Sequence, residues 1–349
     1  MSSILTTLSN AFFHHASWKG YWEPVVQRFV PAWRDGLYRA QVKDVSMLNK
    51  NTTALTLAPD KQWPVHIGGQ HIGLTLEING RLITRVFTVA SDPLTLKQTG
   101  TIRLITRIKH DGLLTPLIPA LENEQWVNIS APQGAFTLPR HSKSTVMIAG
   151  GSGITPFIAM LKALTIDNAN PRAITLYYFA KENEHVLHDE LALIAKTLPS
   201  FSYHLLTRAC HGDAEHYLTQ HPNADWLVCG PAPLYRQVVD VAEIANSDVY
   251  SEHFGAPPML TSNTDSDTFE LRHNTKVLEV SSEQTLLTQL QAKDIPVNYG
   301  CGIGICHQCQ CVKKKGIVKD TRTGALSDSA EQLIQLCVSQ PMSDLELEI

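Results

Sequence analysis

Residues 298–309 form the stretch NYGCGIGICHQC, which carries three of the seven cysteines of the chain. These three stand at the spacing C-x4-C-x2-C, and a fourth follows from a distant segment, so the set is Cys301, Cys306, Cys309 and Cys337. This spacing is typical of the four thiolates that hold a plant-type [2Fe–2S] cluster. The stretch therefore predicts a C-terminal iron–sulfur domain that passes electrons one at a time.

The glycines of this loop also suit a cluster. Gly302 and Gly304 permit unusual backbone torsions and bring amides close to sulfur. Zinc is the alternative, because four cysteines can hold it tetrahedrally, but a zinc ribbon normally uses two C-x2-C pairs rather than one remote cysteine. The additional thiol near the loop, Cys311, is interpreted as a small buried strand residue.

Composition limits the class of protein. A chain of 349 residues with 43% hydrophobic composition is expected to form two or three domains. The net charge of −4, with acids and bases interspersed, argues against nucleic acid as a partner. Clustered cysteines argue against a disulfide framework and favour the reducing cytosol. Since neither a leader nor a spanning apolar run is evident, we expect a cytoplasmic protein, at most peripheral at the inner face of the membrane.

The N-terminal extension, residues 1–37, differs from the rest of the chain. Its large apolar residues recur near helical spacing and are interrupted by prolines; they are Trp18, Trp22, Val25, Val26, Phe29 and Trp33. This pattern predicts short amphipathic helices. They either pack as a flap on the next domain or dock on a membrane or a partner protein, and the residues alone leave both open.

Three segments with different sequence patterns, and a linker before the last of them, follow the extension. Residues 38–139 consist of short β segments with the hairpin signal Asn79-Gly80, which predicts a small antiparallel barrel or sandwich. Residues 140–256 alternate strands with helices, which is typical of a parallel sheet covered by helices. Residues 257–267 are interpreted as a linker, and residues 268–349 as the iron–sulfur domain.

A glycine-rich loop opens the second of these domains. Residues 150–156 form the sequence GGSGITP, directly after an apolar strand and before the helical stretch FIAMLKAL. Glycines let a phosphate approach the backbone, and a helix N-terminus with a proline in its first turn favours a pyrophosphate. The strand, loop and helix context indicates a nucleotide site rather than a merely tight turn. The candidate binding residues are Gly151, Gly153, Thr155 and Pro156.

A third cofactor is needed between nucleotide and cluster. A nicotinamide gives up two electrons as hydride, whereas a [2Fe–2S] cluster accepts one, and a flavin converts between the two. The domain at residues 38–139 is the one left to hold it. The tetrapeptide Arg85-Val86-Phe87-Thr88 ends one of its strands, although such a sequence by itself is also common in ordinary strands.

Taken in this order, these motifs resemble the ferredoxin–NADP reductase superfamily, in its three-domain version with a C-terminal plant-type ferredoxin domain of the α+β β-grasp fold. The resemblance covers about residues 38–349 and implies FAD bound to the antiparallel β-barrel domain. It implies that Arg85 meets the FAD phosphates, that Phe87 lies against the flavin, and that Thr88 hydrogen-bonds near flavin N5. Phe87 departs from the usual tyrosine, so a hydroxyl contact to the ribityl chain is lost.

The resemblance assigns further residues around the flavin and the nicotinamide. Gly112, Leu113 and Thr115 match the segment that caps the flavin pyrophosphate. Cys229, Gly230 and Pro231 match the Cys-Gly-Pro element beside the nicotinamide, and Glu252 and Phe254 match the segment that closes over the flavin. Taken alone, Cys229 would be read as a buried strand residue and Glu252 as a solvated acid. Thr88, Cys229 and Glu252 are thus the candidate catalytic residues.

The adenosine end of the nucleotide is expected at Thr207 and Arg208. These residues end a parallel strand, where an arginine can pair with a 2′-phosphate. We therefore expect NADPH as the donor, with NADH left open.

The most specific prediction concerns the identity of the electron acceptor. The aromatic extension before the flavin domain resembles that of bacterial reductases which serve membrane fatty-acid desaturases, and this predicts a membrane-bound desaturase as partner. The alternative is the reductase component of a ring-hydroxylating dioxygenase or another oxygenase. A redox-sensing module without turnover is a distant third hypothesis.

Overall fold

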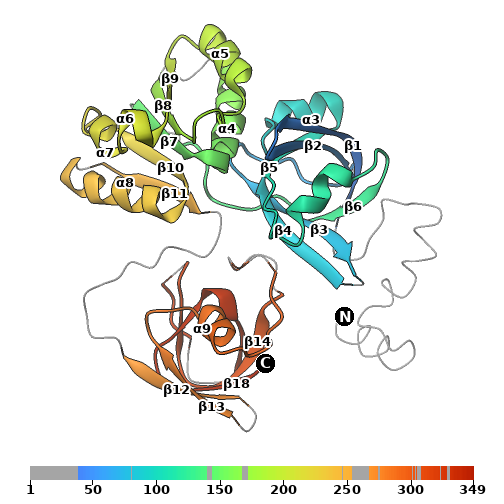
Figure 1. Ribbon diagram of the computed structural model, residues 1–349, viewed down its shortest axis with the longest axis vertical. Coiled ribbons are helices and arrows are strands. Elements are labelled where there is room, and N and C mark those ends of the chain that lie inside the picture. The colour runs from blue at the N-terminus through green and yellow to red at the C-terminus, as the bar shows by residue number, and fades with distance from the viewer. Residues whose placement is uncertain are drawn as a thin grey trace. The chain divides into compact units, whose positions relative to one another are not determined.

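The computed structural model describes residues 38–79, 81–139, 144–166, 172–245, 247–253, 267–273, 276–300, 302, 304, 308–322, 324–327 and 331–349 (Figure 1). The expectations for residues 1–37, Phe254, Cys301 and Cys306 lie outside these residues, as does nearly all of the expected linker. The chain divides into two compact units, Met1–Glu252 and His253–Ile349, which are described separately.

The first part of unit 1 is an antiparallel sheet that curls on itself. Its strands are β1 (Tyr38–Asn49), β2 (Thr52–Pro59), β3 (His71–Ile78), β4 (Arg81–Thr88), β5 (Ile102–Arg107) and β6 (Trp126–Ile129), in the order β4-β3-β6-β1-β2-β5. A bridge between Val89 and Leu104 joins the residue after β4 to β5 at the other edge. The antiparallel flavin domain expected from the sequence is confirmed.

Alternating side chains build the core of this sheet. The inward-facing residues are apolar and fully buried, and they include Leu55, Leu57, Ile72, Leu74 and Leu104. Between strands lie α3 (Pro93–Thr99) and the short helix η1 (Thr115–Ala120). The hairpin signal is confirmed, because Ile78 pairs with Arg81 across the turn and Asn79 adopts a positive φ of 52°.

The second part of unit 1 is a parallel sheet. Its elements are β7 (Ser144–Gly150), η2 (Gly151–Gly153), α4 (Ile154–Ile166), β8 (Ala173–Phe179), α5 (His188–Thr197), β9 (Phe201–Leu206), α6 (Arg208–His211), α7 (Glu215–Leu218), β10 (Asp225–Gly230), α8 (Ala232–Ala245) and β11 (Val249–His253). The strand order is β11-β10-β7-β8-β9, and β7 pairs in parallel with both β8 and β10. The chain leaves β7 to one side and reaches β10 on the other, which makes this point a crevice at the carboxyl ends of the strands.

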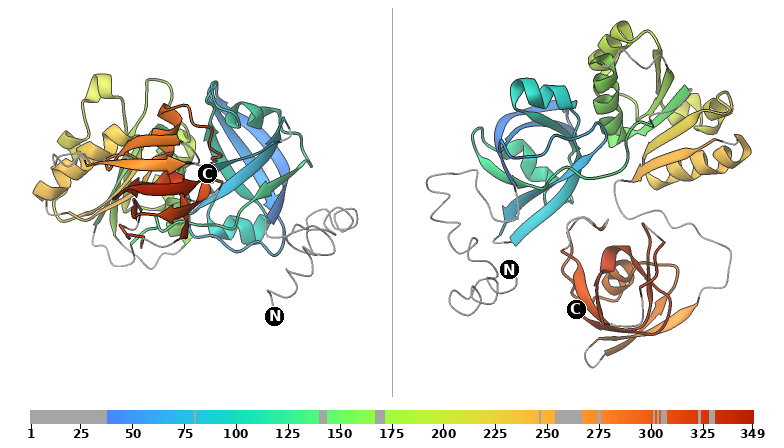
Figure 2. Two further views of the ribbon diagram at one scale, coloured as in Figure 1. Left: turned by 90° about the horizontal axis from the view of Figure 1, so that it is seen from below. Right: turned by 180° about the vertical axis from the view of Figure 1, so that it is seen from behind.

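Helices cover both faces of this sheet (Figures 1 and 2). One core cluster packs α4 and α5 on the strands, and a second packs α8 on the opposite face. Strands buried on both faces explain why β7 is a continuous apolar run rather than an alternating one. The expected α/β domain is confirmed.

The two parts of unit 1 are held together by charged and close backbone contacts. Arg103 on β5 donates to both carboxylate oxygens of Glu190 on α5, at 2.7 Å each. Glu190 also pairs with Lys162 on α4. A Cβ added at Gly68 would lie 3.0 Å from the carbonyl oxygen of Ala159, so the backbone at Gly68 approaches α4 closely.

Unit 2 is a small mixed sheet with one helix. Its elements are β12 (Thr268–His273), β13 (Lys276–Ser281), α9 (Leu286–Ala292), β14 (Gln310–Lys315), β15 (Val318–Asp320), β16 (Gln332–Gln335), η3 (Leu336–Val338), β17 (Ser339–Pro341) and β18 (Leu345–Glu348). The main sheet has the order β13-β12-β18-β14-β16, with β12 and β18 parallel and its other pairs antiparallel. Leu286 and Leu290 of α9 join the core beside Leu336. The α+β domain expected at the C-terminus is confirmed.

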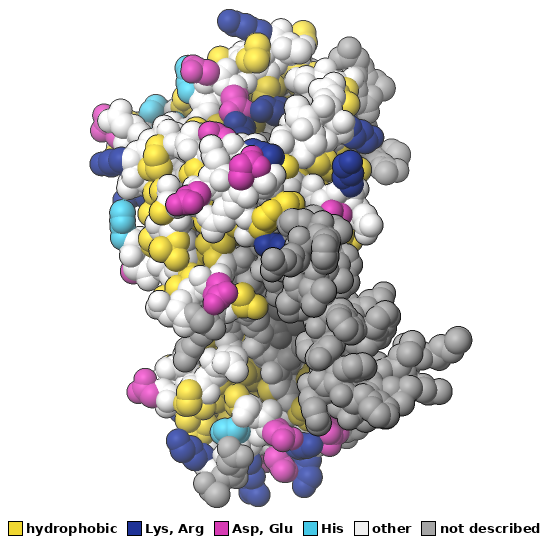
Figure 3. Space-filling model, turned by 90° about the vertical axis from the view of Figure 1, so that its right-hand side faces the viewer, with side chains coloured by type: hydrophobic (Ala, Val, Ile, Leu, Met, Phe, Trp, Pro, Cys, Tyr) yellow, Lys and Arg dark blue, Asp and Glu magenta, His cyan; other side chains and the backbone are white. Residues whose placement is uncertain are grey.

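Charges of both signs are mixed on one face of the molecule (Figure 3). On the face shown in Figure 3, basic and acidic side chains alternate rather than gather by sign. This arrangement agrees with the modest net charge of −4.

Candidate functional site

The glycine-rich loop lies at the crevice of the parallel sheet. Gly151 has a φ of +56°, and α4 begins at Ile154 directly after the loop. A Cβ added at Gly153 would stand 2.0 Å from the carbonyl oxygen of Cys229, so the loop can lie against β10 only as glycine. Thr155 donates its hydroxyl to the carbonyl of Ser152 at 3.1 Å. The loop thus presents a helix N-terminus with backbone amides, which suits a pyrophosphate.

Cys229 and Gly230 end β10 beside this loop. The Cys229 side chain is fully buried, and burial raises the pKa of its thiol well above the ordinary value, with the Glu252 carboxylate adding to the shift. The thiol is therefore protonated at neutral pH. A Cβ at Gly150 would stand 2.7 Å from the ring of Pro231, which shows how closely the two strand ends approach.

Three side chains, two from neighbouring strands and one from a distant strand, meet near the predicted flavin segment. His71, the first residue of β3, pairs in register with Thr88, the last residue of β4. Glu252 on β11 reaches both, because its Oε1 lies 2.8 Å from His71 Nδ1 and its Oε2 accepts from the Thr88 hydroxyl at 3.3 Å. A carboxylate can only accept in this position, so Nδ1 carries the proton. The fold thus brings together Thr88 and Glu252, two of the three predicted catalytic residues.

His71 is the member of this cluster that sequence reasoning missed. Its side chain is nearly buried, and Nε2 has no hydrogen-bond partner among the residues that the structure describes. A buried imidazole nitrogen without a partner is costly in a protein interior, so this atom fits a polar group of a bound cofactor. The available signal was the hairpin itself, since Asn79-Gly80 pairing puts His71 opposite Thr88.

The other predicted flavin residues lie on the expected elements. Arg85 is part-buried on β4 and donates from Nη1 to the carbonyl of Thr84 at 2.8 Å. Phe87 packs against the barrel core, and Val86 precedes it on the same strand. In the second segment, the Thr115 hydroxyl accepts from the Lys109 amide at 3.0 Å and closes the turn. Leu113 of this turn is 56% exposed. The roles of these residues toward FAD stay predictions.

The predicted 2′-phosphate position lies at the end of β9. Thr207 follows the strand and Arg208 begins α6. The Arg208 side chain is 44% exposed and lies 3.7 Å from Asp213 and 3.5 Å from the side-chain oxygen of Gln237. Both contacts are long and at the surface, so the guanidinium can turn toward a phosphate at little cost.

The described half of the cysteine cage fits a metal cluster. Cys309 and Cys337 are 28 residues apart, yet both are buried and their sulfur atoms lie 3.0 Å apart. The backbone amide of Gly304 donates to the sulfur of Cys337 at 3.1 Å. Two buried sulfurs with an amide donor are the surroundings that thiolates of an iron–sulfur cluster need. Cys311 is buried on β14, and burial raises its thiol pKa to about 12, in keeping with a structural thiol.

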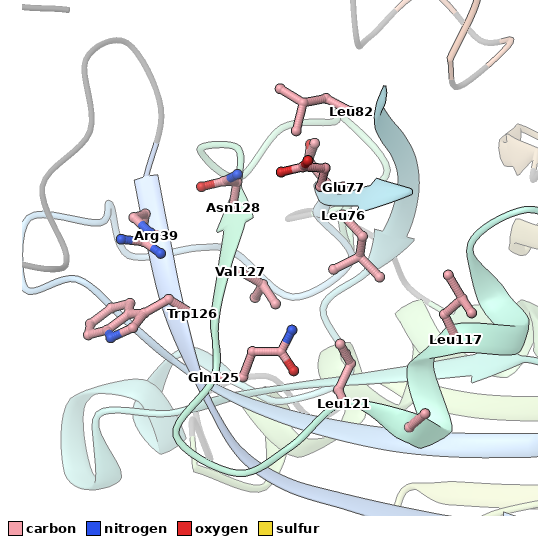
Figure 4. Close-up of a pocket in the computed structure, with 12 residues that line it drawn as sticks. Arg39, Leu76, Glu77, Leu82, Leu117, Leu121, Gln125, Trp126, Val127 and Asn128 are labelled. Carbon is pink, nitrogen blue, oxygen red and sulfur yellow. The ribbon is translucent and has the colours of Figure 1, made fainter. Parts of the chain in front are cut away.

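A separate cavity lies on the barrel. Its volume is about 740 Å³, and its lining includes residues of β1, β3, β4, β6 and η1, among them Arg39, Leu82, Leu117 and Trp126 (Figure 4). The guanidinium of Arg39 lies 5.3 Å from the centre of the Trp126 ring. None of its lining residues is among the predicted cofactor ligands, so this cavity is distinct from the predicted site.

Three family models match the chain in succession. They are an oxidoreductase FAD-binding domain at residues 39–138, an oxidoreductase NAD-binding domain at residues 147–240, and a 2Fe-2S iron-sulfur cluster binding domain at residues 269–342. The succession agrees with the order of the motifs found in the sequence.

Relatives with a similar span are known. An NADPH oxidoreductase of Mycobacterium tuberculosis is 24% identical over 334 residues, which cover 91% of this chain and 86% of the relative. The glycine betaine monooxygenase reductase subunit of Pseudomonas aeruginosa is 24% identical over 318 residues, covering 80% and 86%. The solved structure of phthalate dioxygenase reductase aligns with a TM-score of 0.58 at 22% identity, over 90% of this chain and 98% of that one, and so shares the fold.

The three domains define an NAD(P)H-dependent oxidoreductase whose cofactors are FAD and a [2Fe–2S] cluster. The chain is an electron-transfer reductase with a C-terminal [2Fe–2S] domain, and it transfers electrons from NAD(P)H through FAD to the cluster. Among the described residues, no helix is long and apolar enough to cross a membrane.

Proposed function

We propose that this reductase is the electron-transfer component of an oxygenase. The observation that carries the proposal is the match over 80% of the chain to a protein named as the reductase subunit of a glycine betaine monooxygenase. The phthalate dioxygenase reductase, whose fold is similar, is likewise named for an oxygenase. The desaturase expected from the sequence depends on residues 1–37, which lie outside the described part of the chain. The oxygenase is therefore the better supported acceptor.

Thr88, Cys229 and Glu252 are proposed to line the position of hydride transfer. Bound FAD supplies the conversion of a two-electron donor into one-electron transfer. Cys229 offers a neutral side chain at the end of β10, because its thiol stays protonated. His71 holds Glu252 by a buried hydrogen bond of 2.8 Å, and Glu252 in turn accepts from Thr88. These contacts fix the carboxylate and orient the hydroxyl of Thr88.

NADPH is proposed as the physiological donor. Arg208 lies at the carboxyl end of β9, where the adenosine of a bound nucleotide is expected. A guanidinium that is 44% exposed can form charge-assisted hydrogen bonds to a 2′-phosphate. The loop at Gly151 and Gly153 would then hold the pyrophosphate.

The acceptor is tested by reconstitution. The purified full-length chain, loaded with FAD and cluster, is combined either with a terminal oxygenase component or with membranes that contain a fatty-acid desaturase. Product formation is measured with NADPH and with NADH, and ferricyanide reduction in the same samples reports the intact flavin half. We expect product with the oxygenase and none with the desaturase at equal ferricyanide activity. Product with the desaturase alone would overturn the proposal and restore the sequence expectation.

A further inference from the structure

Arg322 joins the two segments that carry the described cysteines of the cage. Its Nη1 donates to the carbonyl oxygen of Gly304 at 2.6 Å, and its Nη2 donates to the side-chain oxygen of Gln335 at 3.1 Å. The guanidinium is also held by both carboxylate oxygens of Asp320, at 3.2 and 2.7 Å. Arg322 is therefore fixed on several sides, as suits the rigid fork of an arginine.

The acceptors of Arg322 come from opposite sides of the cage. Gly304 belongs to the loop between Cys301 and Cys306, whereas Gln335 ends β16, two residues before Cys337. The turn that carries Arg322 is itself tied to the Cys337 side. The Thr321 amide donates to the carbonyl of Val338 at 2.8 Å, and Asp320 on β15 pairs with Ser339 on β17. Arg322 thus extends from the Cys337 side to the cysteine loop.

Gly304 is a position where such a contact matters. Its φ is +76°, and a glycine has wide backbone freedom unless its neighbours restrain it. The amide before its Cα donates to the sulfur of Cys337 at 3.1 Å, and the carbonyl after its Cα accepts from Arg322. A Cβ added at Gly304 would stand 2.7 Å from Arg322 Nη1, so the two groups are closely fitted. Holding the carbonyl restricts rotation about Gly304 and keeps the amide aimed at sulfur.

The charge of Arg322 is a weaker factor than its geometry. The side chain is 40% exposed, and the Asp320 carboxylate offsets its charge at 2.7 Å. An exposed and paired charge has little influence at a distance, because solvent and its partner screen it. A hydrogen bond to a cluster sulfur, by contrast, acts directly on the thiolate and affects the reduction potential.

We propose that Arg322 is a positioning residue of the [2Fe–2S] site, which clamps the cysteine loop to the Cys337 segment and maintains the hydrogen bond from Gly304 to Cys337. Losing that hydrogen bond disfavours the reduced cluster, which carries the extra negative charge, so the midpoint potential falls. It also loosens the loop, so the cluster is lost more easily. The role is independent of which acceptor the reductase serves.

The test compares Arg322→Gln and Arg322→Lys with Arg272→Gln in the full-length, cofactor-loaded protein. Lysine keeps the charge but lacks the planar fork. Arg272 is the matched control, since its salt bridge is to Glu270 on the same strand at 3.4 Å and its loss removes one exposed charge from the same unit. The readouts are the g-values of the reduced cluster by electron paramagnetic resonance, its midpoint potential by redox titration, and bleaching of visible absorbance by an iron chelator.

We expect both Arg322 variants to lose the cluster about 10-fold faster than the parent, to shift the g-values and to lower the potential. Arg272→Gln should match the parent in all three readouts. If Arg322→Gln is isolated without a cluster, the three readouts are compared between Arg322→Lys and the parent. A lysine variant that matches the parent would show that charge alone matters and would overturn the proposal, as would unchanged spectra and chelator loss in both Arg322 variants.

Discussion

The proposed hydride-transfer site and the predicted cluster site of this chain are assembled in different ways. In the former, His71, Thr88 and Glu252 come from three strands, and His71 and Glu252 are 181 residues apart. In the latter, three of the four predicted ligands lie within residues 301–309 and one, Cys337, is remote. The cluster site needs all four of its ligands, so the loss of one should abolish the cluster. The proposed hydride-transfer site is supported by hydrogen bonds between distant strands, so the loss of one hydrogen bond should reduce its activity only in part. We therefore expect the substitution of a cluster ligand to have the largest effect, and substitutions at the other sites to have smaller ones.

Loss of a cluster ligand should have the largest effect. Cys337→Ala removes a buried thiolate that lies 3.0 Å from the sulfur of Cys309 and leaves no donor atom in its place. We expect the [2Fe–2S] signal in electron paramagnetic resonance to disappear and acceptor reduction through the cluster to be abolished. NADPH-dependent ferricyanide reduction should survive, because the flavin and nucleotide domains form a separate compact unit. An intact signal in this variant would exclude Cys337 as a ligand.

Removing a support of the hydride-transfer site should slow hydride transfer without abolishing it. His71→Ala deletes the 2.8 Å hydrogen bond to Glu252, and a hydrogen bond to a charged group contributes about 1.5–3 kcal/mol, or roughly 10- to 100-fold in rate. Single-turnover bleaching of flavin absorbance by NADPH measures this step. His71→Gln, which keeps a donor, should recover part of the rate. If His71→Ala transferred hydride as fast as the parent, the hydrogen bond from His71 to Glu252 would not support the reaction.

Crowding the nucleotide loop tests a contiguous motif in unit 1. Gly153→Ala would place a methyl group 2.0 Å from the carbonyl oxygen of Cys229, and overpacking of this kind costs about 1–3 kcal/mol. We expect weaker NADPH binding by roughly 10-fold or more, measured by titration of flavin absorbance. Gly100→Asn is the control, because no atom lies within 4 Å of a Cβ there and its φ of 71° and ψ of 15° are left-handed helical torsions, which asparagine tolerates. Equal affinity in both variants would argue against the loop as the pyrophosphate site.

Nucleotide preference should depend on one exposed side chain. Arg208→Leu should raise the KM for NADPH about 10-fold, the value of one charge-assisted contact near the surface, and leave the KM for NADH unchanged. Steady-state ferricyanide reduction with both donors measures the ratio. An equal rise for both nucleotides would indicate a structural role for Arg208 instead.

The smallest effect concerns stability and pH. Burial lowers the pKa of His66 below its ordinary value of 6.5, and its Nε2 lies 2.8 Å from the carbonyl of Ser91. As the pH falls through 6.5, the unfolded chain takes up a proton that the folded chain binds less well, so stability declines below that pH. The Tm measured between pH 7.5 and 5.5 should fall, and His66→Gln should flatten the profile. A profile of equal slope in the variant would assign the effect to other groups, such as His221, whose pKa burial also lowers.

The order of domains was predictable because each one has a local pattern. Alternation in strands such as β3 and β5, the apolar run of β7 followed by glycines, and the spacing from Cys301 to Cys309 are all short-range features. Hydrogen bonds among backbone neighbours and burial of one or two faces produce these patterns directly. Residue roles that came from the family resemblance, such as those of Arg85 and Thr88, stay proposals until they are measured.

The amino-acid sequence by itself determined three domains, their order and their cofactors, since each depends on residues close together in the chain. Only the tertiary structure decided which groups support the reacting ones. His71 and Glu252 meet because β3 begins where β11 ends, and Arg322 meets Gly304 because β15 and β17 pair beside Cys337. Such pairings arise from the packing of distant segments, and no short-range pattern encodes them.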